Sequence, residues 1–99
     1  MKFKVRYTRQ AREDLQRLYQ YLLDCDLSAT RRARKAIGKG IDFLEDFPFS
    51  CRKAMPDNSF LRELIIPFGG AGYVALFEIE NGETVTVLAI RHQREDDYH

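Results

Sequence analysis

The fold of this chain is decided by residues 72–94, GYVALFEIENGETVTVLAIRHQR. Two segments rich in β-branched and aromatic residues, 73–80 and 83–91, flank the dipeptide Asn81-Gly82. A two-residue type I′ turn needs positive φ at both positions, which asparagine and glycine adopt with little strain. The stretch therefore predicts an antiparallel β-hairpin that turns at Asn81-Gly82.

This hairpin is predicted to be apolar on both faces. A two-residue turn pairs Glu80 with Glu83 and Ile79 with Thr84, and side chains alternate between the faces along each strand. One face then carries Tyr73, Ala75, Phe77, Ile79, Leu88 and Ile90, and the other carries Val74, Leu76, Val85, Val87 and Ala89. Apolar side chains on both faces are typical of a sheet that is covered on both sides.

Outward from the hairpin, the pattern predicts two helices and further strands. Residues 3–7 alternate between apolar and charged, which indicates a strand. Thr8 and Ser28 are candidate N-caps of two helices, and the second helix is expected to stop before Pro48. Residues 60–66 are strand-like, and a short strand around 51–54 would precede them.

The resulting order, β-α-α-β-β-β with a further short strand, predicts an α+β fold in one domain, residues 1–99. We expect a helical hairpin packed on one face of a small antiparallel sheet. Because two helices cover only one face, something else should cover part of the other. The candidates are a partner chain, a second copy, or the segments around Pro48 and Pro67.

Gly40 lies on the apolar stripe of the second predicted helix, together with Ala33, Ile37 and Leu44. A glycine inside a helix costs about 1 kcal/mol relative to alanine. Close approach of the first helix at Gly40 would compensate for this cost, and a tolerated surface glycine is the alternative.

Composition and charge exclude several classes of protein. No apolar run approaches the about 20 residues of a membrane-spanning helix, and Cys25 and Cys51 are not spaced as metal ligands. We therefore expect a cytoplasmic protein without metal or cofactor.

Charge is distributed unevenly along the chain. Residues 1–62 carry 14 Lys and Arg against 8 Asp and Glu, and residues 63–99 carry 2 against 7. This asymmetry predicts at most weak direct binding of nucleic acid, since dedicated nucleic-acid-binding domains are more basic.

The end of the hairpin concentrates side chains that could do chemistry. Arg91, His92 and Arg94 follow a buried strand, and Tyr98 comes soon after. A guanidinium holds phosphate or carboxylate, and an imidazole exchanges protons near neutral pH. Charged residues near a chain end are also commonly solvated or paired on the surface, where such pairs contribute little.

Four parts of the chain carry a resemblance to a known family. They are residues 5–8 with Ala11 and 14–15, residues 61–64, residues 72–77 and residues 87–94, the last being the most specific. With the β-α-α-β-β-β order, they make the chain similar to the RelE/ParE superfamily of toxin–antitoxin systems. The local match is to the ParE branch of plasmid-stabilisation toxins.

The resemblance implies two rival activities. RelE-type toxins cut messenger RNA on the ribosome with basic residues and a tyrosine, for which Arg62, His92 and Tyr98 would stand here. Leu64 and Val74 replace two further basic residues of that set, and such charges act most strongly in the transition state. ParE-type toxins lack this set and inhibit DNA gyrase. The departures favour ParE and no catalytic residues, and a third alternative is a non-toxic module that only binds its antitoxin.

The resemblance also implies a protein partner, a cognate ParD-like antitoxin. We expect it to lie on the helical hairpin and the uncovered sheet face, against Leu15, Leu18, Leu22, Val74, Leu76, Val85 and Val87. Arg91, His92 and Arg94 would face the target, gyrase.

Overall fold

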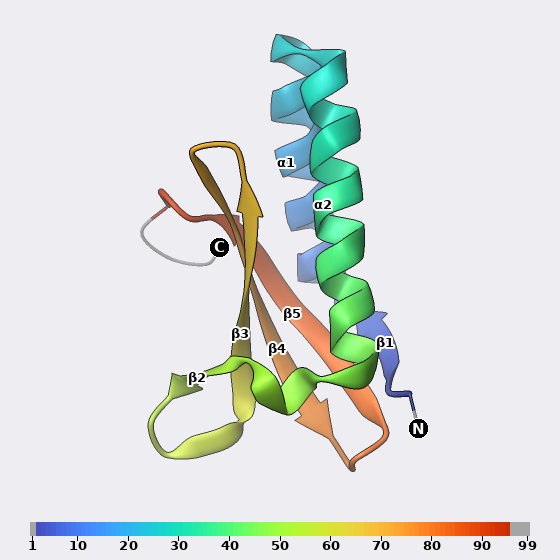
Figure 1. The fold of residues 1–99 in the computed structure, drawn as a ribbon, viewed down its shortest axis with the longest axis vertical. Coiled ribbons are helices and arrows are strands. Elements are labelled where there is room, and N and C mark those ends of the chain that lie inside the picture. The colour runs from blue at the N-terminus through green and yellow to red at the C-terminus, as the bar shows by residue number, and fades with distance from the viewer. Residues whose placement is uncertain (1, 96–99) are drawn as a thin grey trace.

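The computed structural model describes residues 2–95, which form two helices and five strands (Figure 1). Their order is β-α-α-β-β-β-β, with a 3-10 turn before the second strand. The elements are β1 (Lys4–Tyr7), α1 (Arg9–Cys25), α2 (Leu27–Asp46), η1 (Pro48–Ser50), β2 (Arg52–Met55), β3 (Asn58–Phe68), β4 (Ala71–Glu80) and β5 (Thr84–His92). Both helices lie on the same side of the sheet, as the prediction of a helical hairpin on one face requires.

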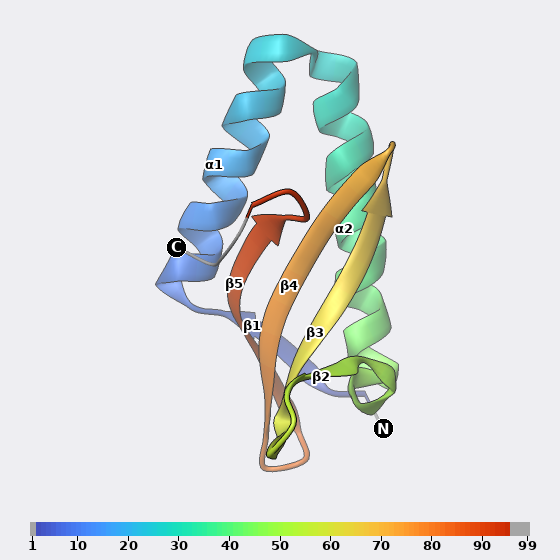
Figure 2. The same ribbon diagram turned by 90° about the vertical axis from the view of Figure 1, so that its left-hand side faces the viewer.

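The sheet is mixed, with strand order β1-β5-β4-β3-β2. β1 pairs with β5 in parallel, and the other neighbours are antiparallel. The expectation of a purely antiparallel sheet was therefore wrong at one edge (Figure 2). The alternation in residues 3–7 predicts a strand, but the direction of pairing depends on a partner about 80 residues away.

Short polar side chains set the helix boundaries. The Thr8 hydroxyl accepts from Ala11 N at 3.1 Å and caps α1 as predicted. Asp26, not Ser28, caps α2, and its Oδ1 accepts from Ser28 N at 2.9 Å. The helix therefore begins at Leu27, and it ends before Pro48 as expected. No helix among residues 2–95 is both long and apolar enough to cross a bilayer.

The β4–β5 hairpin forms, but its register differs from the prediction. Asn81 and Gly82 have φ of 41° and 76°, yet Glu80 pairs with Thr84 and Ile79 with Val85, so that the loop contains three residues. A shift of one residue turns each side chain of a strand to the other face. Val85 and Val87 consequently lie in the core under the helices, not on the far face.

A second irregularity, near the end of β5, turns the following side chains back to the predicted face of the sheet. Leu76 pairs with Ala89 and Phe77 with Val87, which leaves Leu88 as an extra residue in β5. Ile90 therefore faces the helices with Tyr73, Ala75 and Phe77, as expected, and Leu88 does not join that core.

The far face of the sheet is less apolar than predicted. By the observed register, Glu78, Glu80, Thr84 and Thr86 occupy its half near the hairpin turn, where Arg6 Nη2 lies 2.9 Å from Glu80 Oε2. Hydrogen bonds from the Thr86 hydroxyl and from Arg6 lower the pKa of Glu80. The other half keeps Val74, only 2% exposed, beside the side chains of Arg52, Ile65 and Arg91. The chain itself thus covers part of this face.

Gly40 does permit a close approach, but the neighbour is β3, not α1. A Cβ at this position would lie 2.9 Å from Ile66 Cγ1 and 3.2 Å from Leu64 Cδ2. The expectation of a helix–helix contact was wrong because the α2 stripe faces the sheet.

Candidate functional site

The end of β5 is attached to the N-terminal part of α1, through the N-cap Thr8 and through Asp14 in the second turn. The Thr8 hydroxyl donates to Leu88 O at 2.8 Å, next to the extra residue of the strand. The carboxylate of Asp14, 2% exposed, accepts from Ile90 N at 2.9 Å. Buried backbone N–H groups need such acceptors, and a charged acceptor makes a strong bond. α1 therefore fixes where the strand ends and where the following turn begins.

The predicted target-facing residues do not share one face. Tyr73 pairs with His92, and their rings meet edge to face at 5.7 Å on the side of the helices. Arg91 lies on the opposite side, and its Nη1 donates to the carbonyls of His92, Gln93 and Glu95 at 3.3, 3.4 and 2.9 Å. Arg91 thus holds the turn that follows β5, and it is His92 and Arg94 that lie together.

His92 and Arg94 line a pocket of about 480 Å³ between α1 and the turn after β5, which we call the C-terminal pocket. Glu95 closes its rim: Oε1 accepts from His92 N at 2.9 Å and from Arg17 Nη1 at 3.2 Å. His92 Nδ1 accepts from Arg94 N at 3.1 Å, which places the proton of a neutral ring on Nε2. Burial raises the pKa of Tyr73, another lining residue, and keeps its phenol protonated.

The residues named for RNA cleavage are not brought together. Arg62 donates from Nε to Ser59 O at 2.7 Å, and from Nη1 to Phe49 O and Cys51 O at 3.0 and 2.8 Å. Arg62 pairs with Phe77 across the sheet, whereas His92 pairs with Tyr73. Phe77 and Tyr73 are four residues apart on β4, or about 13 Å. Tyr98 lies outside the described residues.

Leu64 and Val74, at which the resemblance implies basic residues in RelE-type toxins, are both buried and face opposite sides of the sheet. Leu64 packs in the core beneath α2, and Val74 lies on the far face. Across residues 2–95, no group of three or more His, Cys, Asp or Glu side chains gathers to hold a metal ion.

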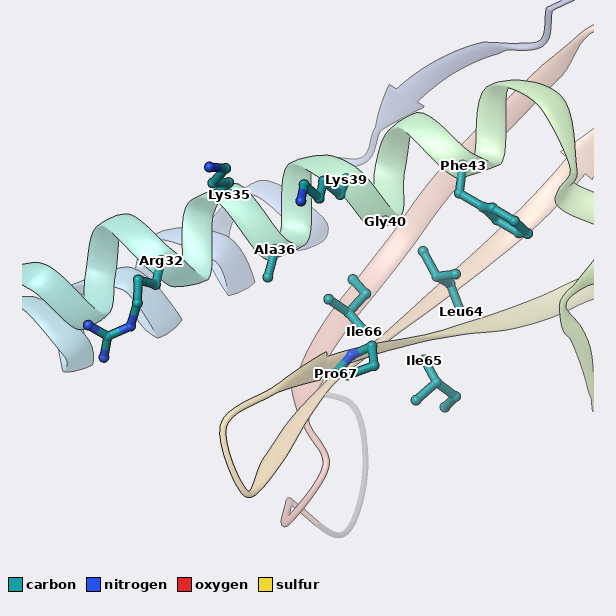
Figure 3. A pocket seen from close by; sticks show the side chains of 10 residues that line it. All are labelled: Arg32, Lys35, Ala36, Lys39, Gly40, Phe43, Leu64, Ile65, Ile66 and Pro67. Atoms are coloured by element: carbon teal, nitrogen blue, oxygen red, sulfur yellow. The ribbon is translucent and has the colours of Figure 1, made fainter.

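A hollow lies between α2 and β3, and we call it the α2–β3 groove (Figure 3). It measures about 750 Å³ and combines an apolar floor with a basic rim. Its lining residues are Arg32, Lys35, Ala36, Lys39, Gly40, Phe43, Leu64, Ile65, Ile66 and Pro67.

An open strand edge borders this groove. β2 pairs with β3 only as far as Glu63, so the stretch 64–68 has no strand neighbour on that side among the described residues. Unpaired strand edges are sites where another chain can add a strand. Ile65 at this edge is 39% exposed.

None of the residues that the sequence predicts to contact the antitoxin lines this groove. Leu18, Val85 and Val87 are core residues, and Leu15 and Leu22 pack against the core. Val74 and Leu76 lie on the far face. The spacing of Arg32, Lys35 and Lys39 around Gly40 on one helix could have indicated a basic rim beside a close contact.

One protein family matches nearly the whole chain. The family described as "ParE toxin of type II toxin-antitoxin system, parDE" matches residues 5–97. The chain belongs to this toxin family. No curated protein matches it in sequence.

Two solved structures share the fold of this ParE-family toxin. A chain of the chromosomal ParDE toxin–antitoxin system from P. aeruginosa superposes with a TM-score of 0.67 at 18% identity, covering 91% of this chain and 95% of that one. A chain of the toxin–antitoxin complex RelBE2 from Mycobacterium tuberculosis gives a TM-score of 0.61 at 18% identity, covering 96% and 95%. At this identity the likeness shows the fold alone.

Proposed function

We propose that this toxin inhibits DNA gyrase and is neutralised by a cognate antitoxin of the ParD type. One observation carries the choice of target: Leu64 and Val74 are buried, and Arg62 is held by three backbone carbonyls. A ribonuclease of the RelE type needs several cations on one phosphate, because that charge stabilises the transition state. Residues 2–95 do not assemble the set that the resemblance names.

Ribosome-dependent RNA cleavage is the second candidate, and the C-terminal pocket is what favours it. Arg17, His92 and Arg94 line this pocket with Tyr73, so an imidazole and two guanidinium groups lie near one another. Histidine is the usual general acid or base at neutral pH. The Glu95 carboxylate forms an ion pair with Arg17 and so reduces the positive charge at the pocket. This reduction weakens the case for RNA cleavage.

One pair of assays separates the two activities. Purified gyrase is given the toxin and supercoiling is followed, while translating ribosomes are given the toxin and messenger cleavage is followed. We expect impaired supercoiling and intact messenger. Normal supercoiling with cut messenger would reverse the assignment and make His92 the first candidate for a catalytic residue.

The target-facing side chains are tested with Arg94→Gln, since Arg94 is exposed and Arg91 holds the turn. We expect weaker gyrase inhibition with unchanged antitoxin binding. Arg12→Gln, an exposed arginine on α1, is the matched control. Equal inhibition by both variants would remove Arg94 from the target surface.

We propose that the antitoxin docks in the α2–β3 groove, with acidic side chains along the rim and apolar ones on the floor. Residues 27–41 carry five cations and no carboxylate: Arg31, Arg32, Arg34, Lys35 and Lys39. Within residues 2–95, none of these five forms an ion pair. Complementary charge around an apolar centre is the usual composition of a protein interface.

The double variant Lys35→Glu/Lys39→Glu tests this docking site. Reversing two rim charges should weaken antitoxin binding about tenfold or more at low salt, mainly through slower association. Lys4→Glu/Lys53→Glu makes the same change of charge away from the groove and should weaken binding far less. Equal losses in the two variants would show that only net charge matters.

A further inference from the structure

The outer edge of β3, beside the α2–β3 groove, carries backbone groups whose direction follows from the neighbouring strands. Gln93 N donates to Gly72 O at 2.9 Å, so the polar backbone groups of Gly72 point to β5. Along an antiparallel strand, these groups point to alternate sides at successive residues. Those of Tyr73 therefore point to β3, where Ile66 is the partner. The groups of Ile65, one residue before Ile66, consequently point away from β4.

This edge offers one hydrogen-bond donor and two acceptors to an added chain. By the same alternation, Glu63, Ile65 and Pro67 all direct their backbone groups away from β4. Glu63 pairs with Arg52 of β2, but within residues 2–95 no strand lies beside Ile65 or Pro67 on this side. Proline has no N–H, so the groups that remain for a partner are Ile65 N–H, Ile65 C=O and Pro67 C=O.

Side chains along this edge alternate between the groove and the far face of the sheet. Leu64 and Ile66 point toward α2, whereas Ile65 points to the other side of β3 (Figure 3). A strand added beside residues 64–68 would share this alternation, and every second side chain of it would enter the groove. A bound helix would instead leave the three backbone groups of the edge unpaired, because the backbone groups of a helix bond one another.

The charges at the groove favour an acidic partner over a second copy of this chain. Arg32, Lys35 and Lys39 line the groove, and no Asp or Glu side chain lines it. Two copies paired edge to edge about a two-fold axis would bring two such groups of cations together. Like charges that face one another across an interface oppose binding, whereas carboxylates are attracted. The edge therefore fits a segment of a different, acidic protein, which is the chemistry proposed above for the antitoxin.

We propose that the antitoxin binds in the α2–β3 groove as an added β-strand beside residues 64–68 of β3. The bound segment donates hydrogen bonds to Ile65 O and Pro67 O, and it accepts one from Ile65 N. Its apolar and acidic side chains that face the groove recur at every second position. The proposal rests on the docking site proposed above and adds the conformation of the bound segment.

Ile65→Pro tests the added strand. This change removes the donor of the edge and places a pyrrolidine ring in the path of the added strand. Because Ile65 N points away from β4, the sheet of the toxin should form as before, which circular dichroism and the melting temperature measure. Isothermal titration with the purified cognate antitoxin should show an affinity about tenfold weaker or more, since a lost hydrogen bond and a steric clash act together. Ile65→Thr keeps the N–H and the β-branched shape, so this matched control should change the affinity less than about threefold.

Amide hydrogen exchange in the wild-type complex provides a second measurement that needs no variant. The Ile65 amide should exchange about a hundredfold more slowly, or slower still, when the antitoxin is bound, because a hydrogen bond to the added strand protects it. An Ile65 amide that exchanges equally fast in the free and the bound toxin would overturn the added strand. Wild-type affinity in Ile65→Pro would overturn it as well.

The Lys35→Glu/Lys39→Glu variant distinguishes failure of the added strand from failure of the docking site. If those two results occur while this variant binds the antitoxin weakly, the antitoxin occupies the groove in another conformation, such as a helix. If they occur and this variant binds as tightly as Lys4→Glu/Lys53→Glu, the antitoxin does not use the groove.

Discussion

The α2–β3 groove and the C-terminal pocket are both apolar hollows beside a helix, but the chain treats them differently. In the C-terminal pocket, Glu95 binds Arg17 and His92 N, and Arg91 holds the turn through three carbonyls. In the α2–β3 groove, Arg32, Lys35 and Lys39 form no ion pair within residues 2–95, and the β3 edge is open.

The polar groups around the C-terminal pocket thus have partners within the chain. The cations and the strand edge around the α2–β3 groove are available to a binding partner. Hydrogen bonds within the chain fix the geometry of the turn after β5, which suits a surface that must present a constant shape to a target. Unpaired charge and an unpaired strand edge gain most from association, which suits an antitoxin.

Asp14→Ala should produce the largest effect, because it detaches the C-terminal pocket from α1. The buried N–H of Ile90 would lose a charged acceptor, at a cost of about 2–3 kcal/mol in the free energy of unfolding. For a domain of this size, that lowers the melting temperature by about 10 °C or more. Glu13→Ala, an exposed neighbour on the same helix, is the control and should change little. Matching melting temperatures for the two variants would show that the hydrogen bond between Asp14 and Ile90 contributes little to stability.

Gly40→Leu should have the next largest effect, and it acts on the groove. The new side chain would collide with Ile66 and Leu64, so we expect a loss of about 1–3 kcal/mol in stability. It would also fill the floor and reduce antitoxin affinity, which isothermal titration measures.

Gly38→Leu is the matched control for this change. A Cβ at Gly38 meets no atom within 4 Å, so a better helix former should stabilise α2 by up to about 0.8 kcal/mol. If the two leucine variants behave alike in melting and in binding, the close contact between α2 and β3 does not shape the groove.

Glu95→Gln should give the smallest effect. It tests how strongly Glu95 holds Arg17 and the backbone of His92 at the rim of the C-terminal pocket. Arg17 is partly exposed, so loss of this ion pair should cost less than about 1 kcal/mol. The amide of His92, which donates to Glu95, should exchange with solvent faster, as NMR can measure. Glu83→Gln in the hairpin loop serves as the control, and equal exchange rates at His92 in both variants would count against the closure.

Local sequence patterns determined the elements of this protein. Asn81-Gly82 gave a hairpin because both residues accept positive φ, Thr8 capped α1, and Pro48 followed the end of α2. These signals act between residues close in sequence, so they can be read without a structure. The family resemblance, carried by residues in β1, α1, β3, β4 and β5, was confirmed by the match over residues 5–97.

The candidate site was only partly predictable. The sequence identified His92 and Arg94, which do line one pocket. It also placed Arg91 on the same target-facing surface, but Arg91 binds the turn after β5. It placed Arg62 beside His92 in the set for RNA cleavage, but the two residues are far apart in the sheet. The residues that it named for antitoxin binding lie on α1 and the hairpin, and none of them lines the groove between α2 and β3. Which side chains share a hollow depends on strand register and helix placement, and these are set by contacts between distant segments.

Tertiary structure decided the rest through a few long-range contacts. The three-residue loop moved Val85 and Val87 into the core, because a shift of one residue turns each side chain of a strand to the other face, and the extra residue Leu88 returned Ile90 to the predicted face. β1 became parallel because it meets β5, and Gly40 met Ile66 because α2 lies over β3. The sequence by itself determined where helices, strands and turns form, since that depends on neighbouring residues. Only the tertiary structure decided which faces meet, because packing side chains that are far apart in sequence selects one register over another.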